Sequence, residues 1–233
     1  MQQGAGGGDV HLAESIVRAE SLTQQVYRYL RDELVQGVFA PGQRIVETKI
    51  AASLRVSRGP VREALRQLVA EQLLREDRGV ITAFAPTFED FQELYQLRAA
   101  VESMAAELAA GRSPSEWAAF PEWTVSFEEN LRDSRVAMDL QDAEALVERN
   151  ADFHRSILVL SGNRRFQHTM SSVSALIQCY WHQVARAVQW PTDMVAEHTQ
   201  IYEAVRMGDG GAAARIMRSH IERDLDVMAR AYR

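Results

Sequence analysis

From residue 86 to the C-terminus, apolar side chains recur at intervals of three and four, and no segment alternates with the two-residue period of a strand. Breaks that contain glycine and proline divide this region into short units. These units predict about six helices, over residues 88–110, 114–133, 139–160, 163–188, 192–207 and 210–231. Helices joined by such short connections pack as neighbours, so the second part of the chain is predicted to be an all-α bundle.

The first part of the chain has a different pattern. Apolar residues at helical spacing begin at Leu22 and stop before Gly37, and two shorter helical segments follow it, separated by a tight turn. Two short strands then flank a turn that contains Gly79. The predicted elements are this first helix, helices over residues 48–54 and 58–72, and a hairpin over residues 73–84. Three helices and a hairpin predict a winged helix-turn-helix, so the expected fold class is mainly α.

The predicted boundary between the two parts is Pro86-Thr87. It gives a partly disordered arm (1–20), a winged helix-turn-helix domain (21–85) and an all-helical domain (86–233). Residues 21–85 carry ten Arg or Lys against seven Asp or Glu, whereas residues 86–233 carry 15 against 22. The net charge is therefore +3 for residues 21–85 and −7 for residues 86–233. This difference is expected if only the N-terminal domain contacts the phosphates of a nucleic acid. The many arginines partly reflect the composition of this chain, however, because it has only one lysine and uses arginine in its place.

The chain's one cysteine excludes an internal disulfide framework and suits a reducing cytosol. No apolar run approaches the length of a membrane span, and the N-terminus lacks the pattern of a signal peptide. We therefore expect a cytoplasmic protein without a membrane partner.

Three arginines recur at intervals of four on the third predicted helix: Arg58, Arg62 and Arg66. Residues at the start of such a helix can enter the major groove of DNA, where a guanidinium fits guanine or a phosphate. A solvated basic face is the alternative. The preceding turn, the suitable helix cap Ser57 and the hairpin favour groove contact. For Arg66, which lies farther from the helix start, a phosphate contact and plain solvation remain equally open.

The run Glu47–Leu65, ETKIAASLRVSRGPVREAL, resembles the GntR family of bacterial repressors, whose corresponding helices read much like "E..LA..L.VSR.PVREAL". The resemblance implies an operator-contacting helix and a wing tip that reaches a minor groove. Gly59 replaces a larger polar residue of several relatives, so it is expected to contribute backbone approach only. Such regulators dimerise on inverted repeats of double-stranded DNA. The implied DNA-contacting residues are Arg58, Arg62, Ser57, Gly59, Thr48, Arg78 and Gly79.

Three histidines of the second part fall on three different predicted helices: His154, His198 and His220. Asn150 precedes His154 by one helical turn, so the two side chains share a helix face. Asp152 lies only two residues from His154 and points to another face. Imidazole nitrogens with an oxygen donor suit zinc, nickel, manganese or iron.

Short segments of the second part, including LRAAVESMAA, FHR, SGN and EH, follow the order of the FCD effector domain that defines the FadR subfamily of GntR regulators. About six helices are nearer to its VanR branch than to the seven-helix FadR branch. The resemblance implies a divalent metal, zinc or nickel, at the floor of a cavity for a small carboxylate effector. The implied metal ligands are Asn150, His154, His198 and His220.

Position 150 departs from the commoner pattern, which has aspartate there. A neutral amide oxygen is a weaker donor, so an Asn150→Asp substitution is expected to tighten metal binding. Arg98 and His182 are the candidate effector-binding residues, Arg98 because a guanidinium can clamp an organic acid. For Arg98 the alternative is an i,i+4 salt bridge with Glu102.

The resulting prediction is a homodimeric transcriptional regulator of the bacterial nucleoid, a repressor, that a small organic acid controls. One alternative keeps the regulator but makes the metal purely structural, without an effector. A metal-dependent hydrolase is the other alternative. It lacks a HExxH motif, and Glu197 is its only candidate general base. The protein is therefore expected not to be an enzyme.

Overall fold

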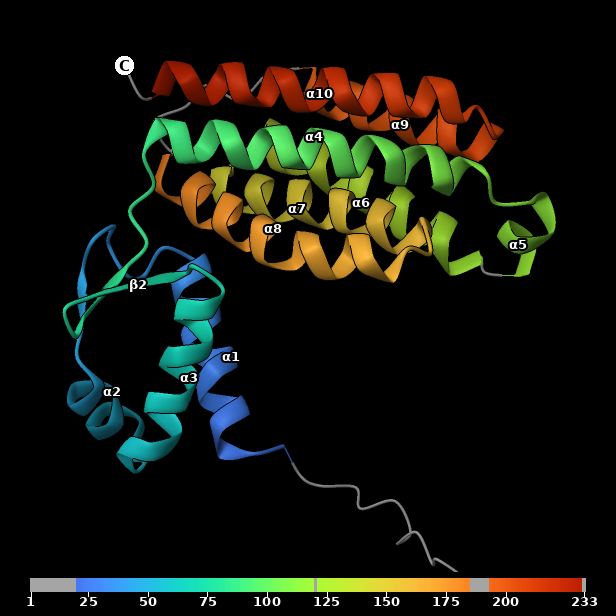
Figure 1. Cartoon of the computed structure of the whole chain (residues 1–233). Helices are drawn as coiled ribbons and strands as arrows, with labels where there is room; N and C mark the ends of the chain where they lie inside the picture. The colour runs from blue at the N-terminus through green and yellow to red at the C-terminus, as the bar shows by residue number, and fades with distance from the viewer. Residues whose placement is uncertain (1–19, 120, 185–192, 232–233) are drawn as a thin grey trace, which may run out of the picture.

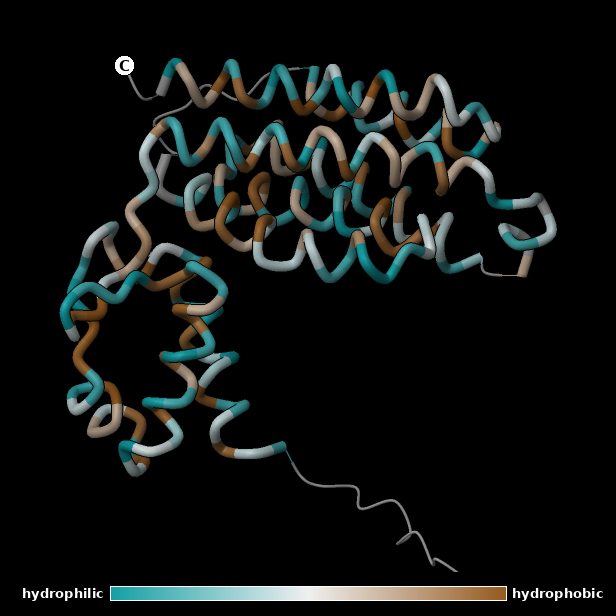
Figure 2. The backbone as a smooth tube through the Cα atoms, in the orientation of Figure 1, coloured by the Kyte–Doolittle hydropathy of each residue, from teal (hydrophilic) through white to brown (hydrophobic). Residues whose placement is uncertain are grey.

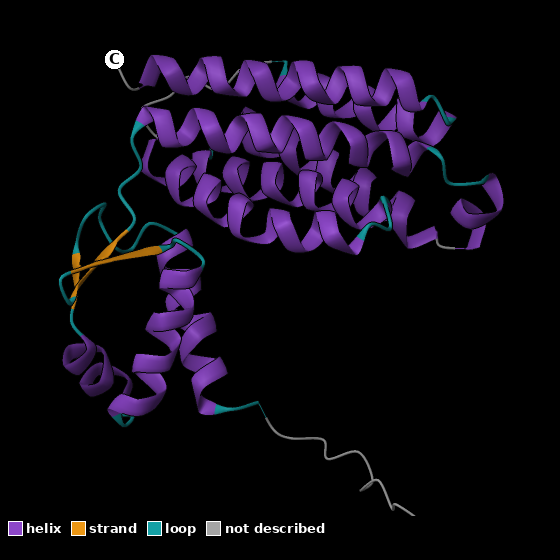
Figure 3. Cartoon of the chain, viewed as in Figure 1, coloured by secondary structure: helices purple, strands orange, loops and turns teal. Residues whose placement is uncertain are grey.

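The computed structural model describes residues 20–119, 121–184 and 193–231, and the predicted arm and the predicted break at residues 190–191 lie outside these ranges apart from residue 20. Helices dominate the structure, and one small sheet lies in the N-terminal part (Figure 3). The N-terminal elements are α1 (Leu22–Val35), β1 (Arg44–Ile45), α2 (Glu47–Leu54), α3 (Arg58–Ala70), β2 (Leu74–Asp77) and β3 (Val80–Ala83).

The predicted winged helix-turn-helix is confirmed. Helix α1 packs on α3, whose apolar side chains Val61, Leu65 and Leu68 are fully buried. The sheet is antiparallel with the order β1-β3-β2, and Leu74 pairs with Ala83. Strand β1 was not predicted, because a strand of two residues is too short to carry a periodicity.

The C-terminal part is a bundle in which α10 lies along α4 (Figure 1). It has seven helices in the described ranges, one more than the sequence indicates. The expectation of the VanR branch stays a prediction. These helices are α4 (Phe88–Ala110), α5 (Pro114–Ala119), α6 (Pro121–Asp139), α7 (Ala143–Leu160), α8 (Arg164–Val184), α9 (Met194–Met207) and α10 (Gly210–Ala231).

The boundaries of the bundle helices differ from the predicted ones where a local signal was overlooked. The predicted helix 114–133 is described as α5 and α6, which lie on either side of residue 120, outside the described ranges; Pro121 stands at the first described position of α6, where a missing N–H is tolerated. Helix α7 begins four residues later than predicted, because the side chain of Asp142 accepts a hydrogen bond from the N–H of Ala145 and caps the helix there. Helix α4 begins as predicted, after a capping box formed by Thr87 and Asp90.

Hydrophobic and hydrophilic residues are mixed along the helices of the bundle (Figure 2), and the buried apolar side chains form one core cluster. Among the described helices, none combines the length and the apolar composition of a membrane span. Large side chains of α4, α7 and α8 fill this interior, including Phe91, Tyr95, Phe153, Ile157 and Trp181.

Helix α8 contributes to two cores. Ile177 and Trp181 belong to the interior of the bundle, whereas Leu176 and Cys179 pack in the core of the winged helix-turn-helix. The thiol of Cys179 donates a hydrogen bond to the carbonyl oxygen of Leu34 in α1, with an Sγ–O distance of 3.3 Å. Helix α8 is thus the bundle element on which the N-terminal domain is docked.

The thiol of Cys179 gives a direct measure of this docking. Burial raises its pKa to about 12, so only about one thiol in 10,000 is ionised at pH 8. We expect the native protein to be unreactive toward a chromogenic disulfide reagent at pH 8 over an hour, and the denatured chain to release one equivalent of chromophore. Prompt reaction of the native protein would show that the two domains separate in solution.

Candidate nucleic-acid interface and metal centre

The start of α3 presents two arginines to solvent. The side chains of Arg58 and Arg62 are 60% and 50% exposed, and both reach the carboxylate of Glu47 at the start of α2. The nitrogen–oxygen distances are 2.7 Å for Arg58 and 3.0 Å for Arg62. Hydrogen bonds from Arg62 and then Arg58 lower the pKa of Glu47 to about 2. One carboxylate therefore holds two guanidinium groups side by side on an open surface.

The other predicted DNA-contacting residues surround these arginines or lie at the tip of the hairpin. Thr48, Ser57 and Gly59 are exposed. Ser57 occupies the N-cap position of α3, but its side chain makes no capping hydrogen bond. A Cβ on Gly59 would meet nothing within 4 Å, so this backbone is open to approach.

The hairpin tip is formed by Arg78 and Gly79, both exposed, with φ angles of 48° and 77°. Two successive residues with positive φ are the mark of a tight type I′ hairpin turn, in which glycine relieves the strain at the second position. The wing therefore ends in a narrow tip that carries a guanidinium.

Arg66 is 70% exposed and lies 3.7 Å from Glu63 on the same helix. The structure leaves both sequence-based interpretations of this residue open.

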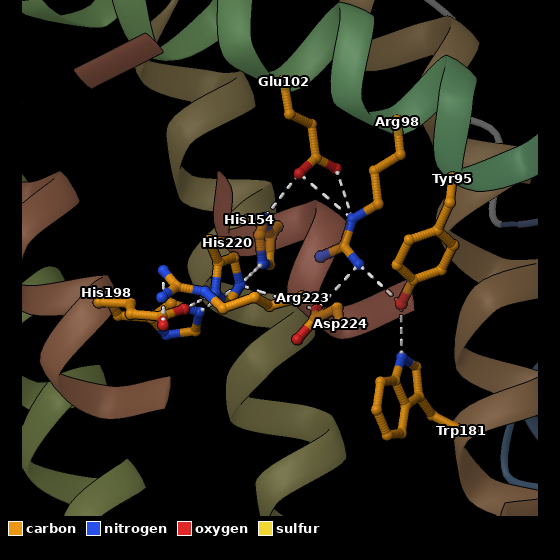
Figure 4. A network of polar contacts seen from close by, with 10 residues as sticks. Tyr95, Arg98, Glu102, His154, Trp181, His198, His220, Arg223 and Asp224 are labelled. Carbon is orange, nitrogen blue, oxygen red and sulfur yellow. Dashed lines mark hydrogen bonds and ion pairs between the residues drawn. The ribbon is translucent and has the colours of Figure 1, made fainter. Parts of the chain in front are cut away.

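The three histidines meet in the interior of the bundle, where His154, His198 and His220 are all buried (Figure 4). The Nε2 atom of His220 lies 3.2 Å from Nε2 of His154 and 3.1 Å from Nε2 of His198. Helices α7, α9 and α10 each supply one ring. The sequence predicted this convergence of three separate helices, and the rings do point toward one another.

Carboxylates lie against two of these rings at Nδ1, the ring nitrogen that points away from the other histidines. Oε2 of Glu197 lies 2.7 Å from Nδ1 of His220, and Oε2 of Glu102 lies 2.6 Å from Nδ1 of His154. A carboxylate at Nδ1 favours the tautomer that carries its proton there. For His220, whose Nδ1 is hydrogen-bonded to Glu197, the inner Nε2 atom then presents a lone pair. Nδ1 of His154 is close to Glu102 without hydrogen-bond geometry, so its contact is one of charge, and a proton at that nitrogen leaves a second lone pair facing the first.

Two facing lone pairs at 3.2 Å repel unless a cation lies between them. Protonation of a ring is an unfavourable remedy, because burial, followed by nearby positive charge, lowers the pKa of His154 and His198 well below 6.5. A metal ion removes the conflict. Two donors that bind one ion at about 2.1 Å with a tetrahedral angle lie about 3.4 Å apart, close to the spacing of these nitrogens.

The buried charges around the rings also fit a divalent cation. Arg98, Glu102, Glu197 and Asp224 are each at most 6% exposed. One positive and three negative groups carry a net charge of −2 when all are ionised, which becomes −1 when Arg223, the ion-pair partner of Glu197, is included. Burial raises the pKa of Glu102, although Arg98 opposes this shift. Because uncompensated buried charge is costly, a divalent ion between the three rings would stabilise the whole cluster.

Asn150 is buried, and its Oδ1 atom has no hydrogen-bond partner among the described residues. It lines a cavity of about 20 Å³ together with Arg98, Glu102, His154, Ile177 and Trp181. A cavity of this size holds about one water molecule. In this conformation this cavity therefore has room for an ion or a water, but not for an organic acid.

Arg98 lies in the same cavity wall, and its guanidinium is already paired. Its Nε atom is 3.3 Å from Oε2 of Glu102, and its Nη1 atom is 3.3 Å from Oδ2 of Asp224. Nη1 also donates to the hydroxyl of Tyr95, which accepts a second hydrogen bond from Trp181. The salt bridge with Glu102, the alternative considered for Arg98, is therefore present in the structure.

His182 does not lie among the residues that line this cavity. It is half-buried on the face of α8 that meets the N-terminal domain, where a Cβ on Gly37 would lie 3.5 Å from its own Cβ. The helical turn of about 100° per residue separates it from the neighbouring Trp181 on the cavity side. The expected effector contact of His182 stays a prediction.

Sequence reasoning missed three carboxylates of this centre or gave them another role. Glu197 was considered as a general base, yet it holds the ring of His220, and Arg223 pairs with its other oxygen at 2.6 Å. Glu102 was considered only as a partner of Arg98. Asp224 was not considered, although it follows His220 by four residues, the same spacing that singled out Asn150 and His154.

A winged helix-turn-helix with exposed arginines, joined to a helical domain with a buried polar centre, defines a DNA-binding transcriptional regulator. Residues 22–83 match the family described as "Bacterial regulatory proteins, gntR family", and residues 93–223 match the FCD domain. The FCD match spans more than half of the chain. The chain belongs to the GntR family of bacterial regulators and carries an FCD effector-binding domain.

Known relatives agree with this assignment. The chain is 30% identical to an HTH-type transcriptional regulator of Bacillus subtilis, YdhC, over 87% of this chain and 88% of the relative. It is 25% identical to the Escherichia coli HTH-type transcriptional repressor RspR, over 87% of each chain. The solved structure of E. coli McbR/YncC has the same fold, with a TM-score of 0.77 at 22% identity, over 92% of this chain and 100% of the other. Regulators, not enzymes, are the proteins that this chain is similar to.

Proposed function

We propose that the protein is a repressor that releases its operator when a small organic acid enters a metal-containing cavity of the FCD domain. The repressor assignment is supported by the names of relatives such as RspR and GlaR of E. coli. We also propose the domain division at residues 85 and 86, and an action in the cytoplasm, at the nucleoid, where a bacterial operator lies. The observation that carries the proposal is the convergence of three buried Nε2 atoms at 3.1 and 3.2 Å.

On the DNA side, Arg58 and Arg62 are proposed to enter the major groove, and Arg78 with Gly79 to approach a minor groove. Thr48, Ser57 and Gly59 complete the surface through backbone or base-edge contacts. The support for this assignment is their common exposure and the open space at Gly59. To bind DNA, each arginine exchanges the carboxylate of Glu47 for a phosphate or a guanine edge.

On the effector side, His154, His198 and His220 are proposed to hold zinc or nickel, with Asn150 beside them. Such an ion supplies a Lewis acid to which a carboxylate can bind. The unpartnered Oδ1 of Asn150 supports its place near the ion. Arg98 is proposed to bind the effector through the part of its guanidinium that faces the cavity.

A purely structural metal, without an effector, is the second candidate. The observation that favours it is the cavity volume of about 20 Å³, because an organic acid enters only if the helices move apart. In that case the ion would stabilise the bundle and the domain would not respond to metabolites.

A homodimer is proposed because one chain carries one reading helix, and two copies read an inverted repeat. Helix α4 offers a surface for the second copy. Leu97, Met104 and Leu108 are 40%, 46% and 42% exposed, and with Val101 they form an apolar stripe at heptad spacing along this helix. A self-complementary stripe of this kind suits a twofold interface.

The test is a combined measurement of DNA release and thermal stability. Metal-stripped protein is reloaded with Zn²⁺ or Ni²⁺ and bound to fluorescent duplex DNA from upstream of its own gene, and a panel of small organic acids is added. We expect one class of acid to lower the DNA affinity about 5- to 150-fold, the range of typical allosteric coupling, and only in the metal-loaded protein. If metal raises stability but no acid alters stability or DNA affinity, the structural role is correct. Failure to retain DNA at low salt would contradict the regulator proposal itself.

A further inference from the structure

Asp224 lies on the inner side of the histidine cluster. It follows His220 by one turn of α10 and is 4% exposed. Its Oδ2 atom lies 3.7 Å from Nε2 of His220 and 3.3 Å from Nη1 of Arg98 (Figure 4). This oxygen is therefore shared between a guanidinium and the nitrogen at the centre of the cluster.

The three carboxylates of the centre differ in the nitrogen that they approach. Glu102 and Glu197 lie against outer Nδ1 atoms, where they can orient rings but cannot reach an ion between the rings. Among the ion pairs formed by the described residues, the approach of Asp224 to His220 is the one that involves an inner Nε2 atom. Of these three carboxylates, Asp224 is the one that approaches an inner nitrogen.

The three rings already have the spacing of donors that share one ion. The ligand atoms of His154, His198 and His220 all lie within 4.8 Å of one another, and Nε2 of His220 lies 3.1 and 3.2 Å from the other two. Donors at about 2.1 Å from one ion, separated by tetrahedral angles, lie about 3.4 Å apart. Asp224 lies outside this group and approaches one of its members, His220, at 3.7 Å, so its side chain would have to rotate toward the other two rings to bind the same ion.

We propose that Asp224 supplies the anionic oxygen ligand of the metal ion. The inference rests on the proposed metal site and deepens it. It assigns to Asp224 the role of the aspartate ligand that position 150, an asparagine here, does not provide. Asn150 offers a neutral amide oxygen, whereas Asp224 adds a negative charge to three neutral imidazoles. The ion would thereby keep one carboxylate in its coordination shell, contributed by α10 instead of α7.

The reassignment also concerns Arg98. Its Nη1 atom is held by the same Oδ2 atom of Asp224. Coordination of this oxygen by the ion weakens its hold on the guanidinium. The N–H that Asp224 now accepts from would then be more available to the carboxylate of an effector, in addition to the part of the guanidinium that faces the cavity.

The experiment measures metal binding directly, without DNA or effector. Metal-stripped full-length protein is titrated with Zn²⁺ against a chromogenic chelator, and with Co²⁺ while visible absorption is recorded. We expect Asp224→Asn to weaken Zn²⁺ binding by about 10- to 100-fold or more and to change the Co²⁺ bands. Asn150→Asp in the Asp224→Asn background should restore most of the affinity, because a carboxylate returns to the other side of the ion.

Asp226→Asn is the matched control, since Asp226 is an exposed residue of the same helix and the chemical change is identical. It should leave both titrations unchanged. Asp224→Glu, which keeps the charge beside Arg98, provides a second variant should the amide fail to fold, and it should shift the Co²⁺ bands.

The outcomes separate the two proposals. If the wild-type protein binds Zn²⁺ and Asp224→Asn binds it equally well with the same Co²⁺ spectrum, Asp224 is only a partner of Arg98 and the inference is overturned. If the wild-type protein binds neither ion, the metal site itself is wrong. Weaker binding of Asp224→Asn with an unchanged Co²⁺ spectrum would mean that Asp224 acts through its charge, and this too would overturn ligation.

Discussion

Replacing Arg58 and Arg62 together by alanine is expected to reduce operator affinity by about 25-fold or more. A well-placed bidentate arginine contributes about 1–3 kcal/mol, so each single replacement should weaken binding about 5- to 150-fold. The losses should not add simply, because both side chains share the carboxylate of Glu47. When one arginine is removed, Glu47 pairs with the other and competes more strongly with DNA. Fluorescence anisotropy on the upstream duplex measures these affinities.

The salt dependence of the same variants separates base contacts from phosphate contacts. An arginine that neutralises a phosphate lowers the slope of log K against log salt by about 1, whereas a base contact leaves the slope nearly unchanged and relaxes sequence preference. Arg132→Ala, an exposed arginine of α6 that is 66% exposed, is the control for the loss of one positive charge. Equal weakening by Arg132→Ala would mean that overall charge, not the helix α3, determines the affinity.

Replacing His220 by alanine is expected to abolish the stabilisation that metal gives to the protein. His220 is the ring whose Nε2 atom approaches both other rings, so its loss removes the centre of the cluster. Metal at 100 times its Kd stabilises the folded state by about 2.7 kcal/mol. For a chain of this size that corresponds to a rise in Tm of roughly 5–11 °C, which differential scanning fluorimetry detects easily.

His168→Ala is the control, since His168 is an exposed residue of α8 outside the cluster. It should keep the full metal-dependent rise in Tm. The His220 variant should also have a lower Tm without metal, because Glu197 loses its ring partner in the interior. A metal-dependent rise in Tm that survives in the His220 variant would contradict the three-histidine centre.

The fold and the histidine cluster were predictable because both depend on signals that repeat along the sequence. Helical periodicity defined the bundle, and the segment Glu47–Leu65 carried enough particular residues to identify the DNA-reading module. The three histidines lie far apart in the chain, and the family resemblance brought them together. Neither signal depends on fine packing.

What remained unpredicted depends on the direction of individual side chains. Glu197 is adjacent to His198 in sequence but contacts His220, because neighbours on a helix point about 100° apart. The same rotation separates His182 from the cavity that Trp181 lines. Asp224 could have been found, since the spacing rule applied to Asn150 and His154 applies equally to His220 and Asp224.

The double membership of helix α8 makes communication between the two ends of the molecule reciprocal. Ile177 and Trp181 form part of the wall of a cavity that would widen to admit the proposed organic acid, while Leu176 and Cys179 pack in the core of the winged helix-turn-helix. A movement of α8 at the cavity would therefore also move the residues that it contributes to the core of the winged helix-turn-helix. By thermodynamic linkage, an acid that weakens the grip on the operator must itself be bound more weakly, by the same factor, whenever the operator is occupied.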